Sequence, residues 1–162
     1  MKRHIAASSL VVLALILPGI ASAKPAVTLK LSGSIVEKAA DGHTMLTPIE
    51  SAAPKSGDQI EYDIAASNAG TSPALHLVPV GRIPAGTAYV AGSAKAAGAR
   101  PEFSLDNGKT WASVPTVTIK DASGAMVVKK ADPALYTAVR FVSDGALAPH
   151  RNALYTYEVR VK

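Results

Sequence analysis

The chain has 162 residues, contains no cysteine and carries a formal net charge of +5 at pH 7. Without cysteine there can be no disulfide-stapled scaffold, so the stability of the fold must come from buried apolar side chains. The Lys and Arg residues are scattered among acidic residues instead of forming a run, which argues against a nucleic-acid-binding protein.

The first 23 residues have the three-part pattern of a secretory signal peptide. Lys2 and Arg3 come first, an apolar run follows at 10–17, and the small residues Ala21-Ser22-Ala23 end the segment. The apolar run is too short to cross a bilayer, and no second apolar stretch follows that would support a retained anchor. We therefore expect cleavage after Ala23, a periplasmic or secreted location, and contact with the membrane only through the removed peptide.

The mature chain is the size of a single domain. Removing residues 1–23 of the 162 leaves 139 residues, which suffice for one hydrophobic core but not for two. The formal charge falls from +5 to +3 when Lys2 and Arg3 leave. We expect one domain over 24–162.

Three runs of the mature chain alternate apolar and polar residues with a period of two, the pattern of a strand with one buried face. The apolar members are Val27, Leu29 and Leu31 in the first run, Ile60, Tyr62, Ile64 and Ala66 in the second, and Tyr155, Tyr157, Val159 and Val161 in the third. Each run predicts a half-buried antiparallel strand.

Weaker strand candidates and turns lie between these runs. The candidates are 33–37, 74–80, 87–91, 101–105, 110–119, 125–129 and 136–143. The turns, which offer positive-φ or Asx-turn residues, are Asn68-Ala-Gly70, Pro84-Ala-Gly86, Asp106-Asn-Gly108, Ser123-Gly124 and Asp144-Gly145. No helical stripe is visible beyond the signal peptide, and the Ala-rich segment 93–99 is expected to be a loop. This regular spacing predicts an all-β sandwich or barrel.

The segment 53–93 resembles a bacterial cell-surface module, the conserved-repeat family also called domain of unknown function eleven. Its ordered features are Gly57-Asp58 before a strand, the turn Asn68-Ala69-Gly70, a valine strand at 74–80, and the run Pro84-Ala-Gly-Thr-Ala-Tyr-Val-Ala-Gly-Ser93. With the remaining elements, the resemblance covers about residues 25–162. It implies an immunoglobulin-like antiparallel β-sandwich in an envelope protein, where such modules often occur as tandem copies.

The resemblance carries no catalytic residues to this chain, because the family has none in common. It also has one departure. The family commonly has Asp three residues before the Pro-Ala-Gly turn, and Gly81 occupies that position here. Any turn-capping or cation contact made by that Asp is therefore in doubt.

One segment fits the Asp-box pattern at each defined position: Ser104, Asp106, Gly108, Thr110 and Trp111. Asp106 can accept hydrogen bonds from turn amides, Gly108 can take a positive φ, and Trp111 can fold back to cap one end of a core. Asp-boxes also occur in sialidase propellers, where an Arg-Ile-Pro motif like Arg82-Ile-Pro84 grips a carboxylate. A propeller needs more chain and a series of boxes, so a sialidase-like glycan-binding fragment is only an alternative.

A second alternative is a periplasmic copper-handling protein. The pair His43 and Met45 offers an imidazole and a thioether, which suit Cu(I), and His76 and His150 lie elsewhere in the chain. No cluster of further His or Met residues accompanies the pair, so these residues are expected to be surface residues. His76 is expected to be the outward member of its strand. We predict no metal and no cofactor.

The remaining residues favour a protein that is not an enzyme. The mature chain has no Gly-x-Ser-x-Gly, His-Glu-x-x-His or phosphate-binding glycine loop, and Glu61 and Asp63 are expected on a solvated strand face. Aromatic residues are few, which disfavours a carbohydrate platform unless Tyr89 or Tyr136 lies at an edge. The sequence predicts a non-catalytic exported module whose loops or edge strand contact an envelope protein or a surface polymer.

Overall fold

The structure is a computed structural model that describes residues 23–39 and 41–162, so the predicted signal peptide lies outside the described residues except for Ala23. The described chain is all-β, and none of its residues forms a helix that could span a bilayer. Its elements are β1 (Val27–Lys38), β2 (Thr44–Pro48), β3 (Gln59–Asn68), β4 (Val80–Arg82), β5 (Thr87–Tyr89), β6 (Lys95–Ala96), β7 (Ala99–Ser104), β8 (Thr116–Lys120), β9 (Met126–Lys130), the 3₁₀ helix η1 (Pro133–Leu135), β10 (Ala138–Ser143) and β11 (Asn152–Val161).

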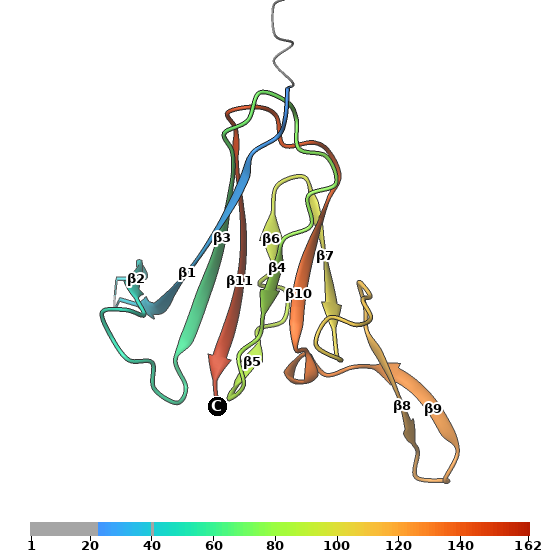
Figure 1. The fold of residues 1–162 in the computed structure, drawn as a ribbon. Helices are drawn as coiled ribbons and strands as arrows, with labels where there is room; N and C mark the ends of the chain where they lie inside the picture. Colours follow the sequence, from blue (N-terminus) through green and yellow to red (C-terminus); the bar gives the residue numbers. More distant parts are fainter. Residues whose placement is uncertain (1–22, 40) are drawn as a thin grey trace, which may run out of the picture.

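Two antiparallel sheets face each other and form a sandwich (Figure 1). The larger sheet has the order β2-β1-β3-β11-β5, with β6 also paired to β11, and the smaller sheet has the order β4-β10-β7. The strands β8 and β9 pair only with each other and project from the body as an arm. The predicted β-sandwich is therefore confirmed.

The core lies between the two sheets because the register brings apolar residues of neighbouring strands to one face. Ile60 of β3 stands opposite Val159 of β11, and both are buried. The smaller sheet contributes Val139 and Phe141 of β10, which are completely buried. The apolar residues of the alternation predicted for β3 and β11 thus point into the core, and the polar residues lie on the outer face.

Glycine at position 81 is explained by close packing between the sheets. A Cβ on Gly81 would lie 2.4 Å from Cε1 of Tyr157, so no larger residue fits while that ring stays in place. The Tyr157 hydroxyl donates a hydrogen bond to the Arg82 carbonyl at 2.7 Å. Burial, with a smaller contribution from Tyr62, raises the pKa of Tyr157. The departure at Gly81 therefore accommodates a buried, hydrogen-bonded tyrosine.

Several predicted boundaries were wrong. The candidates at 27–31 and 33–37 form the single strand β1, and β2, a strand that was not predicted, pairs with the second half of β1. The candidate at 74–80 is mostly irregular, since Pro73 and Pro79 lack an N–H group and His76 has a φ of 53°. His76 is exposed, as expected, but in a loop. The predicted loop 93–99 contains the short strand β6, and β8 begins only at Thr116.

The first half of β1 is not buried as predicted. Val27, Leu29 and Leu31 are 38%, 48% and 59% exposed. Their side chains share a face with the buried Ile35, and their β3 partners Ile64 and Ala66 belong to the core. The smaller sheet therefore covers β3 and β11 but leaves the start of β1 uncovered, which alternation alone could not reveal.

The carboxamide of Asn68, at the end of β3, joins three segments of the chain. Its Oδ1 accepts hydrogen bonds from the amides of Ala26 and Gly70, each at 3.1 Å. Its Nδ2 donates to the carbonyls of Ser72 at 2.9 Å and Leu147 at 3.0 Å. Asn68 is completely buried, so these partners replace the water it has lost. The predicted turn residue is thus a long-range tie.

Gly70 serves this tie through close approach rather than through a positive φ. A Cβ at this position would lie 2.3 Å from the Lys24 carbonyl oxygen and 2.5 Å from the Ala26 amide nitrogen. The positive φ expected in the turns does occur at Gly86, Gly108 and Gly124. Glycine at position 70 lets the N-terminal segment lie against the turn.

Replacing Asn68 by Ala is expected to lower the free energy of unfolding by about 3 kcal/mol, because buried amides and carbonyls lose their partners. Urea denaturation followed by tryptophan fluorescence measures the change. Asn152 is exposed, and Asn152→Ala is a matched control expected to change the stability by less than about 0.5 kcal/mol. Equal effects of the two substitutions would contradict the role of the Asn68 amide.

Candidate functional site

The residues predicted for the two alternatives are exposed and are not gathered into a site. His43 and Met45 lie on the β2 hairpin, where Met45 is 56% exposed. Within the described residues, no three side chains of His, Cys, Asp or Glu are arranged to hold a metal ion. Arg82 is exposed on β4 and forms no ion pair with any described residue. This arrangement gives the sialidase alternative, which requires acidic neighbours around Arg82, no support among the described residues.

The Asp-box forms a tight connection that closes where Phe103 bridges to Ala112. The buried Ser104 hydroxyl donates to Oδ1 of Asp106 at 2.7 Å and accepts from the Gly108 amide at 2.8 Å. Gly108 has a φ of 89°, as its place in the turn predicts. The hydroxyl is thus fully used inside the turn.

Asp106 is the second centre of this turn. Its Oδ1 accepts from the amides of Lys109 at 3.0 Å and Thr110 at 2.9 Å, and its Oδ2 accepts from the Thr110 hydroxyl at 2.7 Å. Hydrogen bonds from the Thr110 hydroxyl, the Thr110 amide and the Ser104 hydroxyl hold the pKa of Asp106 well below its usual value. The carboxylate therefore stabilises the turn, and both of its oxygens accept hydrogen bonds within it.

Trp111 lies in a different place from the core end that was predicted for it. Its ring is not part of the core cluster and lies 4.9 Å from the guanidinium carbon of Arg140. Arg140 alternates with the inward Val139 and Phe141, so this contact is on the outer face of the smaller sheet. Arg140 also pairs with Glu102 at 2.6 Å. Trp111 covers an ion pair there and does not cap the core.

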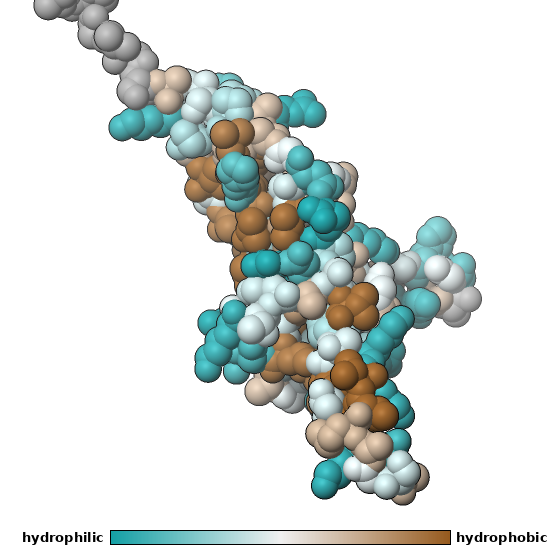
Figure 2. All heavy atoms as spheres, turned by 90° about the vertical axis from the view of Figure 1, so that its right-hand side faces the viewer, coloured by the Kyte–Doolittle hydropathy of each residue, from teal (hydrophilic) through white to brown (hydrophobic). Residues whose placement is uncertain are grey.

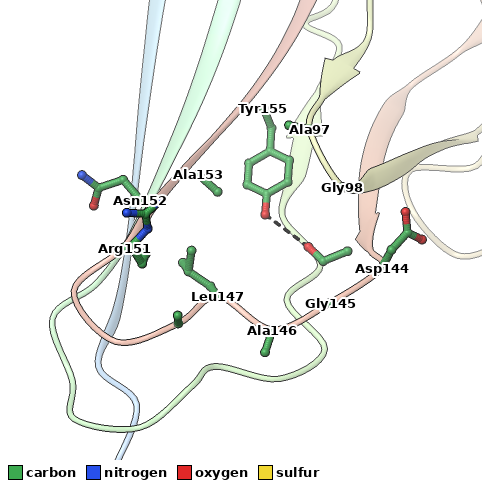
Figure 3. Close-up of a pocket in the computed structure, with 12 residues that line it drawn as sticks. Ala97, Gly98, Asp144, Gly145, Ala146, Leu147, Arg151, Asn152, Ala153 and Tyr155 are labelled. Carbon is green, nitrogen blue, oxygen red and sulfur yellow. Dashed lines mark hydrogen bonds between the residues drawn. The ribbon is translucent and has the colours of Figure 1, made fainter.

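A hollow of about 340 Å³ lies at one end of the sandwich, and half of the residues that line it are Ala or Gly (Figure 3). Within it, the hydroxyls of Tyr155 and Ser143 are hydrogen-bonded at 3.2 Å. Asp144 pairs with Arg100 at 2.9 Å, and Arg151 is the other charged lining residue. These groups lack the paired nucleophile and base that acyl or phosphoryl transfer needs.

The outer face of the larger sheet holds three carboxylates in adjacent rows. Glu61 stands opposite Glu158, with Asp63 two residues further along β3. Burial is the largest cause that raises the pKa of Glu61. The negative charges of Asp63 and Glu158 raise this pKa further, and the positive charge of Lys95 lowers it. Asp63 is half-buried, and its Oδ1 lacks a hydrogen-bond partner within the described residues. Glu61 and Asp63 therefore lie on the predicted outer face, but they are only partly exposed.

The first half of β1 forms a free sheet edge. β2 pairs with residues 34–38 of β1, and among the described residues no strand pairs with 27–33 on that side. The Gly33 carbonyl accepts from the Ile49 amide on the β2 side, whereas the Ala26 and Lys24 carbonyls accept bonds on the β3 side. Backbone groups in antiparallel ladders alternate between the two sides. The N–H and C=O groups of alternate residues therefore face the free side, and these residues are Val27, Leu29 and Leu31.

This edge combines backbone groups that no described residue pairs with and exposed apolar side chains on the inner face. Sequence reasoning predicted a strand here, but it could not predict which side of the strand would be free. Pro25, at the start of the segment, lacks an N–H group, which is typical of sheet edges. The edge of β1 is the candidate binding site of this chain.

The arm is a second exposed apolar element. Ile119, Met126 and Val128 are 40%, 63% and 68% exposed, although two-stranded hairpins are marginally stable on their own. Figure 2 shows apolar side chains over the upper part of the body and again toward the projecting lower end. The arm also carries three lysines on its strands, Lys120, Lys129 and Lys130.

Comparison of the sequence with protein-family models finds no matching family, and comparisons with curated proteins and with solved structures find no match. The resemblance to the conserved-repeat module stays a prediction.

Asp106 is expected to remain ionised at about pH 3 in the folded chain. Its folded-state pKa lies below the unfolded value of about 3.9, so the ionised group stabilises the fold above that pH, and this contribution is lost as the pH falls through the folded pKa. An NMR titration of the Asp106 carboxyl carbon measures the pKa in the folded chain. Thr110→Val should raise the pKa, whereas Thr118→Val on the exposed arm should not. A midpoint near 4 in the unsubstituted chain would contradict this assignment.

Proposed function

We propose that this chain is a non-catalytic exported module that binds an extended segment of another envelope protein along the free edge of β1. The observation that carries the proposal is the row formed by Val27, Leu29 and Leu31. Their backbone groups face the free side, and their side chains lie exposed on one face. The backbone of an added strand would pair with these backbone groups. Its alternate side chains would pack against the exposed apolar side chains.

The edges at β4, β5, β6 and β7 fit an added strand less well. β4 has only three residues, and β5 and β6, at the far side of the larger sheet, have three and two. On β7, Phe103 already bridges to Ala112. β1 offers the longest free run next to an uncovered apolar face. Lys30 and Pro25 are the kinds of residue that discourage indiscriminate edge pairing, which favours a specific partner.

A binding role is also supported by the way the polar groups are used. Ser104 and Asp106 form hydrogen bonds within their own turn, and the hollow at the end of the sandwich lacks a nucleophile–base pair. Burying the exposed halves of Leu29 and Leu31 against a partner would contribute about 1 kcal/mol each, in addition to the backbone pairing. Passive recognition requires nothing more from the chain.

The edge is tested by placing a photo-crosslinking residue at Leu31 and exposing the purified chain to an envelope fraction. We expect adducts with a second protein. Leu29→Pro in the same chain should lower the adduct yield by about tenfold, because it removes an N–H group on the free side and leaves the ladder with β3 intact.

The matched control is Leu29→Val, which keeps both the N–H group and an apolar side chain and should preserve the adducts. A crosslinker at Leu154, which is 53% exposed on the outer face, tests for indiscriminate contact. The proposal is wrong if the Leu29→Pro variant keeps the full yield, or if adducts form only from position 154. Thermal unfolding of each variant confirms that the sandwich is retained.

A further inference from the structure

We infer that Asn107 is a latent modification site, where the Asp-box turn holds back an intramolecular deamidation that proceeds once the turn opens. The site goes beyond the proposed function, because it lies in the turn that follows β7 of the smaller sheet and not at the edge of β1 (Figure 1). The reaction takes water as its only co-reactant and releases ammonia.

The reaction joins two neighbouring residues. The Gly108 amide nitrogen loses its proton and attacks Cγ of Asn107, so that a C–N bond forms between them. The bond from Cγ to Nδ2 breaks, and the departing nitrogen takes up a proton and leaves as ammonia. Water then opens the resulting cyclic imide at one of its two carbonyl carbons, which leaves either aspartate or isoaspartate at position 107.

Asn107 is the asparagine of this chain best suited to this reaction. Of the three Asn residues, only Asn107 is followed by Gly, whereas Asn68 and Asn152 are followed by Ala. Glycine has no Cβ that would crowd the attacking nitrogen. Asn107 is exposed, and its carboxamide forms no hydrogen bond with any described residue. The carboxamide is therefore open to attack whenever the backbone allows it.

The folded turn keeps the attacking nitrogen out of this reaction. The Gly108 N–H donates to the hydroxyl of the buried Ser104 at 2.8 Å. A deprotonated amide attacks through the electron pair that held its proton, and in this turn that direction leads to the Ser104 oxygen. Intramolecular reactions need the reacting atoms to be aligned as well as close. The hydrogen bond to Ser104 therefore has to break before the ring can close.

The peptide group on the other side of Asn107 is held as well. The Asn107 N–H donates to the Thr137 hydroxyl at 2.9 Å, and this hydroxyl donates to the Ser104 carbonyl at 3.1 Å. Asn107 and Gly108 have φ values of 59° and 89°, so the turn uses two successive left-handed residues. Because both flanking peptide groups are fixed, local opening of the turn controls the rate of deamidation.

Formation of isoaspartate would prevent the turn from closing again. It adds a methylene to the main chain between residues 107 and 108, within a connection whose ends are fixed where Phe103 bridges to Ala112. Either product also adds a carboxylate directly beside Asp106, whose oxygens already accept hydrogen bonds in the turn. The modified chain is thus a lasting record of time spent with the turn open.

Mass spectrometry of tryptic peptides measures the rate of deamidation during incubation of the purified chain in mildly basic buffer. A sample digested without incubation sets the background. We expect the folded chain to deamidate at Asn107 at least about tenfold more slowly than the chain unfolded in guanidinium chloride, since loss of one such hydrogen bond corresponds to about a tenfold change in rate. Ser104→Ala should raise the rate in the folded chain by about tenfold, and Thr137→Val should also raise it.

Ser93→Ala is the matched control. Ser93 is also buried, and its hydroxyl accepts from the Glu158 amide at 2.9 Å on the larger sheet. This variant also loses a buried serine hydroxyl, but it should deamidate at Asn107 at the unsubstituted rate. Thermal unfolding of each variant shows that it is folded at the temperature of incubation. If Ser104→Ala does not fold, Thr137→Val provides the test.

The products report the chemical route. A mixture of isoaspartate and aspartate at position 107 is the signature of the cyclic imide, whereas direct hydrolysis of the carboxamide yields aspartate alone. Equal rates in the folded and unfolded chains, an unchanged rate in the folded Ser104→Ala and Thr137→Val variants, or aspartate as the sole product would overturn the inference. None of these outcomes bears on the edge of β1.

Discussion

The geometry of the N-terminal strand depends on one buried carboxamide. Asn68 uses both ends of its side chain, accepting from Ala26 and Gly70 and donating to Ser72 and Leu147. An amide buried without partners is costly, so the three segments that satisfy it are held in one arrangement. The start of β1 is therefore fixed along β3 by a side chain that is not part of the sheet ladder. The free edge is presented in place and does not have to be ordered when a strand is added, which lowers the entropic cost of binding.

The strands and the sandwich could be predicted because their signal is local. In β3 and β11, alternation indicated the inward side chains correctly, since both strands are central and face the smaller sheet. In β1 the same alternation indicated the correct face but the wrong burial. Periodicity shows which side chains share a face of the strand. Whether that face is buried depends on how far the opposite sheet extends over it. The segment 74–80 failed for a different reason, because its valine and leucine residues suggest a strand while Pro73 and Pro79 interrupt backbone pairing.

In the site, too, features made by residues close in sequence could be predicted, and features made by residues far apart in sequence could not. The Asp-box turn was predictable because Ser104, Asp106 and Gly108 interact within a few residues of one another. Asn68 was recognised only as a turn residue, since its partners Ala26 and Leu147 are 42 and 79 residues away in the chain. The free edge could not be predicted, because which strand lies beside which is a property of the topology. The carboxylates Glu61 and Asp63 were placed on the correct face, but their partial burial depends on packing around β3.

The arm meets the body at a narrow base. The Ala131 amide donates to the Pro115 carbonyl at 2.9 Å, and both residues are buried. Everything from Thr116 to Lys130 lies beyond this clasp, and none of it contributes to the core cluster. The entropy of closing a loop grows only slowly with its length, so this excursion can be lengthened, shortened or exchanged for another sequence at little expense to the sandwich. The arm is therefore the natural insertion point for engineering, a place where a foreign epitope or tag can be displayed away from the edge of β1.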